Sequence, residues 1–282
     1  MQKKIKVMKK TTKHLIALTA AVLALFGCNN NNSAEGYTDT GSIVEETPQE
    51  IAYNTYSGGD SNQTYIVSMD ITLPEKDNDE VVEAIRSQLL GIMDAPSAST
   101  DPQAIVNRKV QQKKIELTEM SSELTSFLDD EENYRPQLVF QMQLSHMSTN
   151  KYFMTFVLHG YEYGGGAHGG SGLSYLVFDM STGKQISEKD ITTNKSAITN
   201  LLRTTALREY KRNNPEFEVF EVDNITANGN FFITPDSLIY QYGEYEIAAY
   251  CFGRPTFRLN KKEVKPYINP ESAVYKYWFG EN

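Results

Sequence analysis

Alternating apolar and polar positions predict several β-strands in this chain. Residues 65–73 (YIVSMDITL) place an apolar side chain at nearly every second position, and Pro74 ends the run. Residues 137–147 and 151–163 are also strand-like, and the polar turn 148–150 between them predicts an antiparallel hairpin. The second run is apolar on both faces for most of its length, so we expect a central strand. Shorter strands are expected at 174–179, 230–233, 237–242 and 256–259.

Apolar residues at intervals of three and four predict helices. The spacing predicts one helix over residues 77–93 and an amphipathic helix over residues 194–212. Asp101 and Pro102 provide an N-cap followed by a proline at the first helical position, so residues 103–128 are expected to form one helix or a broken pair. A last helical turn is expected at 264–268.

The order of these elements indicates the fold class. Strands and helices alternate loosely, and hairpins are more frequent than the spacing of β-α-β units. We therefore expect an α+β fold with antiparallel sheets, packed helices and two sequential subdomains, residues 51–160 and 161–282.

The first residues have the three parts of an export signal. Six lysines between positions 3 and 13 precede an uncharged run from Leu15 to Phe26, and Leu25-Phe26-Gly27-Cys28 ends that run. A membrane-spanning helix needs about 20 apolar residues, which this run does not reach. Met8 is an alternative start that leaves a signal of ordinary length.

The end of this signal resembles the lipobox of bacterial lipoprotein signal peptides. That resemblance implies cleavage after residue 27 and attachment of diacylglycerol and fatty acyl chains such as palmitate to the Cys28 thiol. Each buried methylene contributes about 0.8 kcal/mol, so two or three chains give a lasting membrane anchor. A secretory signal with a chance cysteine is the alternative. We expect a membrane-anchored protein of the cell envelope, at the periplasmic face of the outer membrane.

The next segment, residues 28–50, is polar, acidic and almost free of large apolar side chains. Such a segment cannot bury enough surface to offset the entropy lost on ordering, so it is expected to be a flexible tether.

Charge restricts the class of partner. The chain has 27 basic and 36 acidic residues, and removal of residues 1–27 takes away six lysines, which leaves a net charge of −15. Because binding to phosphates needs basic clusters, no nucleic-acid partner is expected. A cationic partner would be attracted, although acidity for solubility is an equally good explanation.

Only Cys251 remains once Cys28 carries lipid, so no internal disulfide can form. Its neighbours are apolar (IAAYCFG), which favours a buried packing cysteine over a nucleophile.

Residues 161–172 (YEYGGGAHGGSG) form the most unusual segment, with six glycines between positions 164 and 172. Glycines gather where φ must be positive or where a backbone must approach another group closely. Three interpretations remain open: a structural corner with a hydrogen-bonded His168, a ligand-binding loop, or a catalytic cluster.

Two blocks resemble one bacterial extracytoplasmic family. The first contains Tyr161-Glu162-Tyr163, Gly165-Gly166-Ala167-His168-Gly169, Phe178-Asp179 and Thr182-Gly183-Lys184. The second contains Phe231-Phe232-Ile233-Thr234, Leu238-Ile239-Tyr240 and Tyr245-Glu246-Ile247-Ala248, followed by Tyr250 and Gly253. These blocks resemble the domain shared by the RsiV anti-sigma factor and the PdaC peptidoglycan deacetylase, over about residues 60–270. Two features depart from the family pattern. Ala249 lies where the family often has a proline, and residues 254–260 are more basic than the family pattern predicts.

The resemblance implies binding rather than catalysis. The RsiV domain binds lysozyme, but its membrane helix and sigma-binding segment are not expected here. In PdaC a separate domain performs deacetylation, and this chain lacks that domain's Thr-Phe-Asp-Asp and His-x-x-x-His motifs. The accessory, binding part of the family remains.

Catalytic patterns are incomplete in the glycine-rich segment. Gly169-Gly170-Ser171-Gly172-Leu173 lacks the last glycine of a nucleophile elbow, and no Gly-Lys-Ser/Thr follows to make a phosphate loop. His159 and Glu162 lie on opposite faces of the expected strand, which disfavours a shared metal. No cofactor or metal is expected. The enzyme alternative is an envelope polysaccharide hydrolase or deacetylase that uses His168 and Glu162.

We therefore expect a non-catalytic envelope protein that binds a lysozyme-like protein or a peptidoglycan-derived glycan. Tyr240, Tyr242, Tyr245 and Tyr250 could form a glycan platform, although alternating strand tyrosines are more often half-buried packing. The candidate ligand-binding residues are Tyr161, Tyr163, Gly164, Gly165, Gly166, His168, Gly169, Tyr245 and Glu246.

Overall fold

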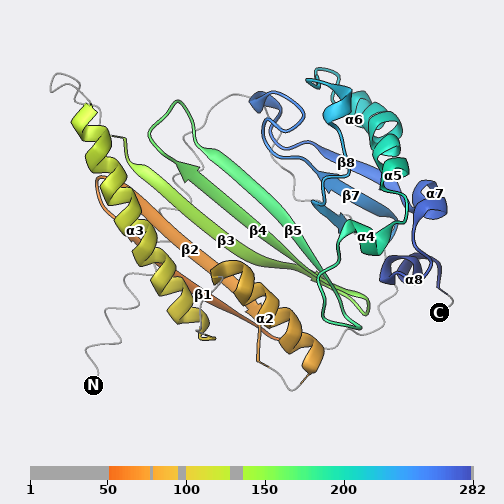
Figure 1. Cartoon of the computed structure of the whole chain (residues 1–282), viewed down its shortest axis with the longest axis horizontal. Helices are drawn as coiled ribbons and strands as arrows, with labels where there is room; N and C mark the ends of the chain where they lie inside the picture. Colours follow the sequence, from red (N-terminus) through yellow and green to blue (C-terminus); the bar gives the residue numbers. More distant parts are fainter. Residues whose placement is uncertain (1–50, 77–78, 95–99, 128–135, 281–282) are drawn as a thin grey trace. The chain divides into compact units, whose positions relative to one another are not determined.

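A computed structural model describes residues 51–76, 79–94, 100–127 and 136–280. The export signal, Cys28 and the tether lie outside these residues. The described chain forms a five-stranded sheet and a three-stranded sheet, each packed against helices (Figure 1). The expected α+β class is confirmed.

The larger sheet has the strand order β1-β2-β3-β4-β5. Its strands are β1(Tyr53–Ser61), β2(Tyr65–Pro74), β3(Leu138–Thr149), β4(Phe153–Tyr163) and β5(Gly170–Asp179). Neighbours pair in antiparallel fashion except β2 and β3, which are parallel. The expectation of purely antiparallel sheets was therefore wrong for this pair, because the chain crosses over through two helices and returns in the same direction.

The two crossover helices cover one face of the larger sheet (Figure 1). They are α2(Glu80–Asp94) and α3(Pro102–Phe127), and the second is one continuous helix rather than a broken pair. Alternate residues of β2 point at them and are almost fully buried, as the period of a strand predicts: Tyr65, Val67, Met69, Ile71 and Leu73. This face forms one of the two hydrophobic cores.

The predicted hairpin of β3 and β4 is confirmed, and β4 is a central strand as expected. Phe156 of β4 is fully buried, and Leu158 is partly buried. Residue 160, the predicted subdomain boundary, lies within β4, and the glycine-rich segment after it connects β4 to β5 of the same sheet.

The smaller sheet has the order β6-β7-β8, all antiparallel. Its strands are β6(Phe231–Ile233), β7(Ser237–Gln241) and β8(Thr256–Asn260), and all three were predicted. The predicted helix near 194–212 is α5(Lys195–Leu201), a π-helical segment η1(Leu202–Ala206) and α6(Leu207–Asn213). The predicted last turn begins earlier, as α7(Lys261–Val264) and η4(Lys265–Tyr267).

Three short helices complete this part of the chain: α4(Glu188–Ile191), η2(Val222–Asn224) and η3(Tyr250–Phe252). A further helix, α8(Ala273–Phe279), was not expected from the sequence. Ser272 caps it by accepting a hydrogen bond from the Tyr275 N–H, and the Trp278 indole N–H donates to Thr234 O at 2.8 Å. The second hydrophobic core gathers between these helices and the smaller sheet.

The side chain that precedes the smaller sheet forms hydrogen bonds with the backbone at the outer edge of β5. Asn230, just before β6, accepts from the Tyr175 N–H at 2.9 Å and donates to Leu173 O at 2.8 Å. Tyr175 also packs against Phe232, with ring centroids 4.5 Å apart. The two sheets are thus held together beside the glycine-rich hairpin.

Candidate functional site

The glycine-rich segment forms the tight connection between β4 and β5. Gly165 has φ +91°, a left-handed conformation that favours glycine. A Cβ at this position would lie 3.0 Å from Pro136 Cγ and 3.3 Å from Leu124 Cδ1 of α3. The Tyr163 hydroxyl donates to Gly166 O at 2.9 Å and closes the loop. Gly165 therefore faces a helix of the protein.

Gly169 is buried beneath the Tyr161 ring. A Cβ at position 169 would lie 2.5 Å from Tyr161 Cζ, so any larger residue must displace the ring. Because Gly169 has no side chain, the Tyr161 ring can lie against the backbone just before β5.

His168 links this hairpin to the segment after β7. Its Nδ1 lies 3.0 Å from Gly169 O, and because a carbonyl oxygen only accepts, Nδ1 carries the hydrogen. In the neutral ring Nε2 is then an acceptor, and the Tyr245 hydroxyl donates to it at 3.2 Å. Nδ1 thus forms a hydrogen bond within the hairpin, and Nε2 joins the hairpin to the loop that carries Tyr245.

Three rings stack at this point. The His168 and Tyr250 centroids are 4.5 Å apart with planes 19° apart, and the Tyr245 and Tyr250 centroids are 5.5 Å apart with planes 29° apart. Tyr245 remains 53% exposed and Tyr250 38% exposed. Tyr245 has φ +63°, the one positive value among non-glycine residues of the described chain. Such strained residues persist where surrounding contacts fix them, and they are frequent at functional sites.

Two carboxylates shape the loop that carries these tyrosines. Glu244 accepts from the Ser171 N–H at 3.1 Å and from the Ser171 hydroxyl at 2.6 Å. Glu246 accepts from the Gly243 N–H at 2.6 Å and from the Asn228 amide at 3.0 Å. Partial burial, and then the Glu244 carboxylate, raise the pKa of Tyr250, so its hydroxyl stays protonated at neutral pH.

A surface cavity of about 630 Å³ lies beside the stacked rings. Its floor is unusual, because a Cβ built at Gly170 or Gly172 would meet nothing within 4 Å and one at Gly160 would only just reach Gln141 O. Gly160 and Gly172 are direct partners across β4 and β5. We call this cavity the glycine–tyrosine hollow; its lining is Phe140, Gln141, Met142, Gly160, Glu162, His168, Gly169, Gly170, Ser171, Gly172, Glu244, Tyr245 and Tyr250.

The structure brings together some of the residues predicted for a ligand site. His168, Gly169 and Tyr245 line the hollow, and the Tyr161 ring packs directly against Gly169. Tyr163, Gly164, Gly165, Gly166 and Glu246 do not line it, and Glu246 instead holds its own turn.

Other lining residues were not singled out as site residues. Glu244 was not named at all, although it directly precedes Tyr245, and Gly170 and Gly172 were counted in the cluster without a role. The signal that could have found the floor is the period of a strand: Gly170 and Gly172 alternate on one face, opposite Glu162 and Gly160.

The four tyrosines considered as a platform divide into two pairs. Tyr240 and Tyr242 are fully buried in the second core, whereas Tyr245 and Tyr250 are exposed at the hollow. Cys251 is exposed, so the expectation of a buried cysteine was wrong. The apolar neighbours Ile247 and Ala248 turn inward, while η3 directs Cys251 to the surface.

The charged groups at the hollow are arranged around an exposed carboxylate. The side chain of Glu162 is 67% exposed, and Lys113 Nζ lies 3.6 Å from its Oε1. His159 lies on the opposite face of β4, and burial, followed by the nearby Arg254, lowers its pKa. Within the described residues no three His, Cys, Asp or Glu side chains are grouped to hold a metal ion.

None of the helices in the described part of the chain is both long enough and apolar enough to cross a membrane.

Comparisons with known proteins agree with this fold. Residues 184–262 match the model of a family described as "Protein of unknown function (DUF3298)". This segment includes Glu244, Tyr245 and Tyr250 but not the glycine-rich hairpin. A search of curated proteins gave no match.

Two solved structures are similar over most of the chain. A member of the DUF3298 family from Bacteroides fragilis NCTC 9343 has a TM-score of 0.67 and 16% identity, over 81% of this chain and 97% of that chain. A DUF3298 family protein from Pseudomonas aeruginosa PAO1 has a TM-score of 0.56 and 14% identity, over 79% and 96% respectively. The chain thus contains a segment that matches the DUF3298 family, and it shares its fold with DUF3298 proteins.

Proposed function

We propose that this protein is a lipid-anchored protein of the cell envelope that binds a peptidoglycan-derived glycan in the glycine–tyrosine hollow, without catalysis. The anchor is the lipid on Cys28, at the periplasmic face of the outer membrane. The observation that carries the proposal is the pair of exposed rings, Tyr245 and Tyr250, beside a floor without side chains.

The shape and chemistry of the hollow suit a sugar ring. Ligand sites combine apolar and aromatic walls with a few polar groups that orient the ligand. Here the tyrosine rings offer flat apolar faces for the C–H face of a sugar, and their hydroxyls offer hydrogen bonds. The Glu162 carboxylate is an acceptor for sugar hydroxyls at the same place.

The walls of the hollow are held before any ligand arrives. Tyr245 is fixed through its hydroxyl to His168 and through ring stacking, and Glu244 fixes its loop to Ser171. A site that is ordered in advance loses less entropy on binding, so weak contacts with a sugar count for more.

The same geometry disfavours the enzyme alternative that uses His168 and Glu162. A general base needs a free acceptor nitrogen within reach of the substrate proton. The Nε2 of His168 already accepts from Tyr245, and Glu162 lies beside Lys113. Both residues are better suited to holding and contacting a ligand.

A second candidate ligand is a cationic protein of the lysozyme type, and the exposed Glu162 favours it. A lysine or arginine could pair with this carboxylate and lie over a tyrosine ring. The net charge of −15 expected for the processed chain would attract such a partner.

Titration of the mature chain with a peptide-free oligosaccharide from peptidoglycan tests the first ligand. Tyr245→Ala and Tyr250→Ala should each weaken binding about tenfold or more, a loss of at least ~1.4 kcal/mol. Phe220→Ala is the matched control, because Phe220 is 52% exposed and does not line the hollow. Absence of saturable glycan binding contradicts the proposal. So does binding by the two tyrosine variants that is as tight as binding by the unsubstituted chain.

Lysozyme in the same titration separates the candidates. Binding of lysozyme but not of the oligosaccharide, weakened by Glu162→Gln and by added salt, would favour the cationic partner instead.

A further inference from the structure

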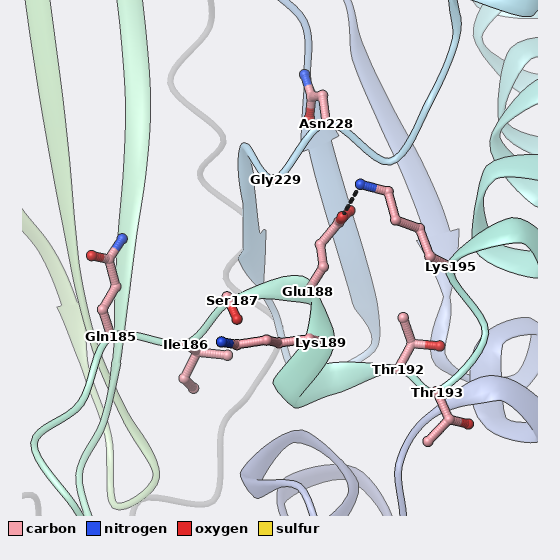
Figure 2. A pocket seen from close by; sticks show the side chains of 10 residues that line it. All are labelled: Gln185, Ile186, Ser187, Glu188, Lys189, Thr192, Thr193, Lys195, Asn228 and Gly229. Atoms are coloured by element: carbon pink, nitrogen blue, oxygen red, sulfur yellow. Dashed lines mark ion pairs between the residues drawn. The ribbon is translucent and has the colours of Figure 1, made fainter.

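Another surface cavity, of about 680 Å³, lies at α4 and shares no lining residue with the glycine–tyrosine hollow. Figure 2 shows its ion pair, in which Glu188 Oε2 lies 2.7 Å from Lys195 Nζ. The buried Tyr240 hydroxyl also donates a hydrogen bond to the Glu188 carboxylate. This carboxylate is therefore engaged by two groups of the chain, and it gives no indication of a ligand.

The glycine–tyrosine hollow has a feature that contacts within the chain do not explain, which is the set of glycines in its floor. Gly170 and Gly172 lie on β5, and Gly160 lies on β4. None of these glycines has a φ in the left-handed region. A Cβ at Gly170 or Gly172 would meet nothing within 4 Å, and one at Gly160 would reach only Gln141 O, at 4.0 Å. Neither backbone conformation nor internal packing therefore requires glycine at these positions.

Glycine inside a strand is unfavourable when nothing requires it. It loses more conformational freedom on folding than any other residue, and it offers no side chain for cross-strand packing. Strand glycines mark a bulge, a bend, or a point where a ligand or another backbone approaches closely. The pairing of β4 with β5 keeps one register along this stretch, without a bulge. The glycines in the floor therefore indicate close approach by another molecule.

This face of β4 and β5 continues beyond the hollow. Three successive cross-strand pairs lie on it: Glu162 with Gly170, Gly160 with Gly172, and Leu158 with Ser174. All three β5 members of these pairs are exposed, and none has a side chain larger than that of serine. The next residue of β5 on the same face, Leu176, is buried and ends the exposed row. We call these three pairs the β5 track.

The β5 track is an uncovered strip of a face that is otherwise packed. The crossover helices α2 and α3 lie over the β1 and β2 side of this face (Figure 1). Phe140 and Leu144 of β3 lie opposite Glu162 and Leu158, and both are buried in the core beneath these helices. From Gly170 to Ser174 the track extends about 14 Å, at ~3.4 Å per residue. It is therefore long and narrow, with the exposed tyrosines of the hollow at one end.

We propose that the glycan bound in the hollow is a linear chain longer than a disaccharide, and that it lies along the β5 track from the tyrosines to Ser174. This inference rests on the proposed glycan binding and adds the length and direction of the ligand. The C–H faces of the sugars lie on the glycine backbone, where side chains would hold them away. The Glu162 carboxylate at one end and the Ser174 hydroxyl at the other accept hydrogen bonds from sugar hydroxyls. Leu158 adds an apolar contact between them.

Calorimetric titration of the mature chain with a peptide-free disaccharide and a peptide-free tetrasaccharide from peptidoglycan tests the inference. The tetrasaccharide should bind at least about tenfold more tightly, because only the longer chain contacts the tyrosines and Ser174 at the same time. This comparison uses the unsubstituted chain, so it does not depend on the folding of any variant.

One substitution tests the direction of the ligand. Ser174→Ile places a stiff, β-branched side chain at the far end of the track. It should lower the affinity for the tetrasaccharide to near that for the disaccharide, and leave the affinity for the disaccharide unchanged. Gln143→Ile is the matched control, because Gln143 is exposed and lies on the opposite face of the same sheet. Thermal melts of both variants show whether each chain remains folded.

The outcomes separate this inference from the proposed function. Equal affinities of the unsubstituted chain for the two oligosaccharides would overturn the inference, whereas glycan binding at the hollow would stand if Tyr245→Ala and Tyr250→Ala weakened both. Tighter binding of the tetrasaccharide that Ser174→Ile leaves unchanged would also overturn it, because the ligand would then lie elsewhere. Absence of saturable binding of either compound would contradict the proposed function itself, and this inference with it.

Discussion

Glu244 holds Ser171 through two hydrogen bonds, one from its backbone N–H at 3.1 Å and one from its hydroxyl at 2.6 Å. Glu244 belongs to the loop after β7, and Ser171 belongs to β5, so this contact joins the two sheets at the glycine–tyrosine hollow. The neighbouring Tyr245 keeps its left-handed backbone beside this contact.

Replacement of the Glu244 carboxylate should therefore destabilise the contact between the two sheets at the glycine–tyrosine hollow. Glu244→Ala removes both acceptors and leaves the Ser171 N–H unpaired, which should lower the free energy of unfolding by about 1–3 kcal/mol. Urea unfolding measures this change, and oligosaccharide affinity should fall with it. Glu221→Ala, at an exposed residue outside the hollow, is the control. Equal unfolding midpoints for both variants would refute the anchoring role.

Two adjacent glycines separate stability from binding. Gly169→Ala places a Cβ 2.5 Å from Tyr161 Cζ and should cost about 1–3 kcal/mol of unfolding free energy. Gly170→Ala meets nothing within 4 Å, so stability should stay within about 0.5 kcal/mol while the new methyl group narrows the hollow. Melting curves should therefore show a lower melting temperature for Gly169→Ala and little change for Gly170→Ala. Oligosaccharide titrations should show weaker binding for Gly170→Ala although its stability is unchanged. A stable Gly169→Ala protein would contradict the described packing of Tyr161.

His168 distinguishes binding from turnover. His168→Ala removes the acceptor of the Tyr245 hydroxyl and should weaken oligosaccharide binding and stability by about 0.5–1.5 kcal/mol each. Under the enzyme alternative the same change should remove about 10²–10⁴-fold of turnover. An assay of peptidoglycan hydrolysis decides between them. Hydrolysis by the unsubstituted chain that His168→Ala abolishes at an unchanged melting temperature would replace the binding proposal.

Two histidines should make stability depend on pH. Burial lowers the pKa of His146 and, with help from Arg254, of His159 below the ordinary value of 6.5. The unfolded chain therefore takes up protons first as the pH falls, so this contribution to stability is complete above about pH 6.5 and decreases as the pH falls below that value. Urea unfolding across this range measures the decrease, and His146→Gln should reduce its slope.

Two carboxylates affect stability in a separate pH range, which lies below that of the histidines. The Lys114 hydrogen bond lowers the pKa of Asp60, and the Ser187 hydroxyl lowers that of Asp190, below 3.8. Their contribution is present above that value and is lost only as the pH falls through their folded pKa. A decrease just below about pH 6.5 that persists in a variant lacking both His146 and His159 would contradict the assignment to histidine.

Processing at the amino terminus tests the anchor. Cys28→Ser removes the thiol that acylation requires, so cells should accumulate an uncleaved precursor or release unlipidated protein. Metabolic labelling with a palmitate analogue and fractionation of membranes measure both. Lipid labelling that persists in Cys28→Ser would refute the lipoprotein proposal.

Elements with a strong periodic pattern could be predicted from the sequence. β2 and β4 carry apolar residues at strand spacing, and their segments were identified to within a few residues. β1 was missed because it is an edge strand with a polar sequence (YNTYSGGDS), which needs little apolar surface. The parallel pairing of β2 with β3 also could not be predicted, because strand direction depends on where the two crossover helices dock.

Residue composition identified only the part of the candidate site that is close in sequence. His168 and Gly169 stood out because glycines gather around them, whereas Tyr245 was named through the family resemblance. Glu244 and Tyr250 lie 76 and 82 residues after His168, and only tertiary folding brings them to the glycine-rich hairpin.

The pairing of Asn230 with Leu173 and Tyr175 has a consequence for self-association. An uncovered β5 would offer free N–H and C=O groups to another chain. The Asn230 amide engages the Tyr175 N–H and the Leu173 carbonyl as an incoming strand would, so these two groups are not open to a strand of another molecule. For the lipid-anchored chain proposed above, whose local concentration on a membrane would be high, this pairing would disfavour association of neighbouring molecules through β5.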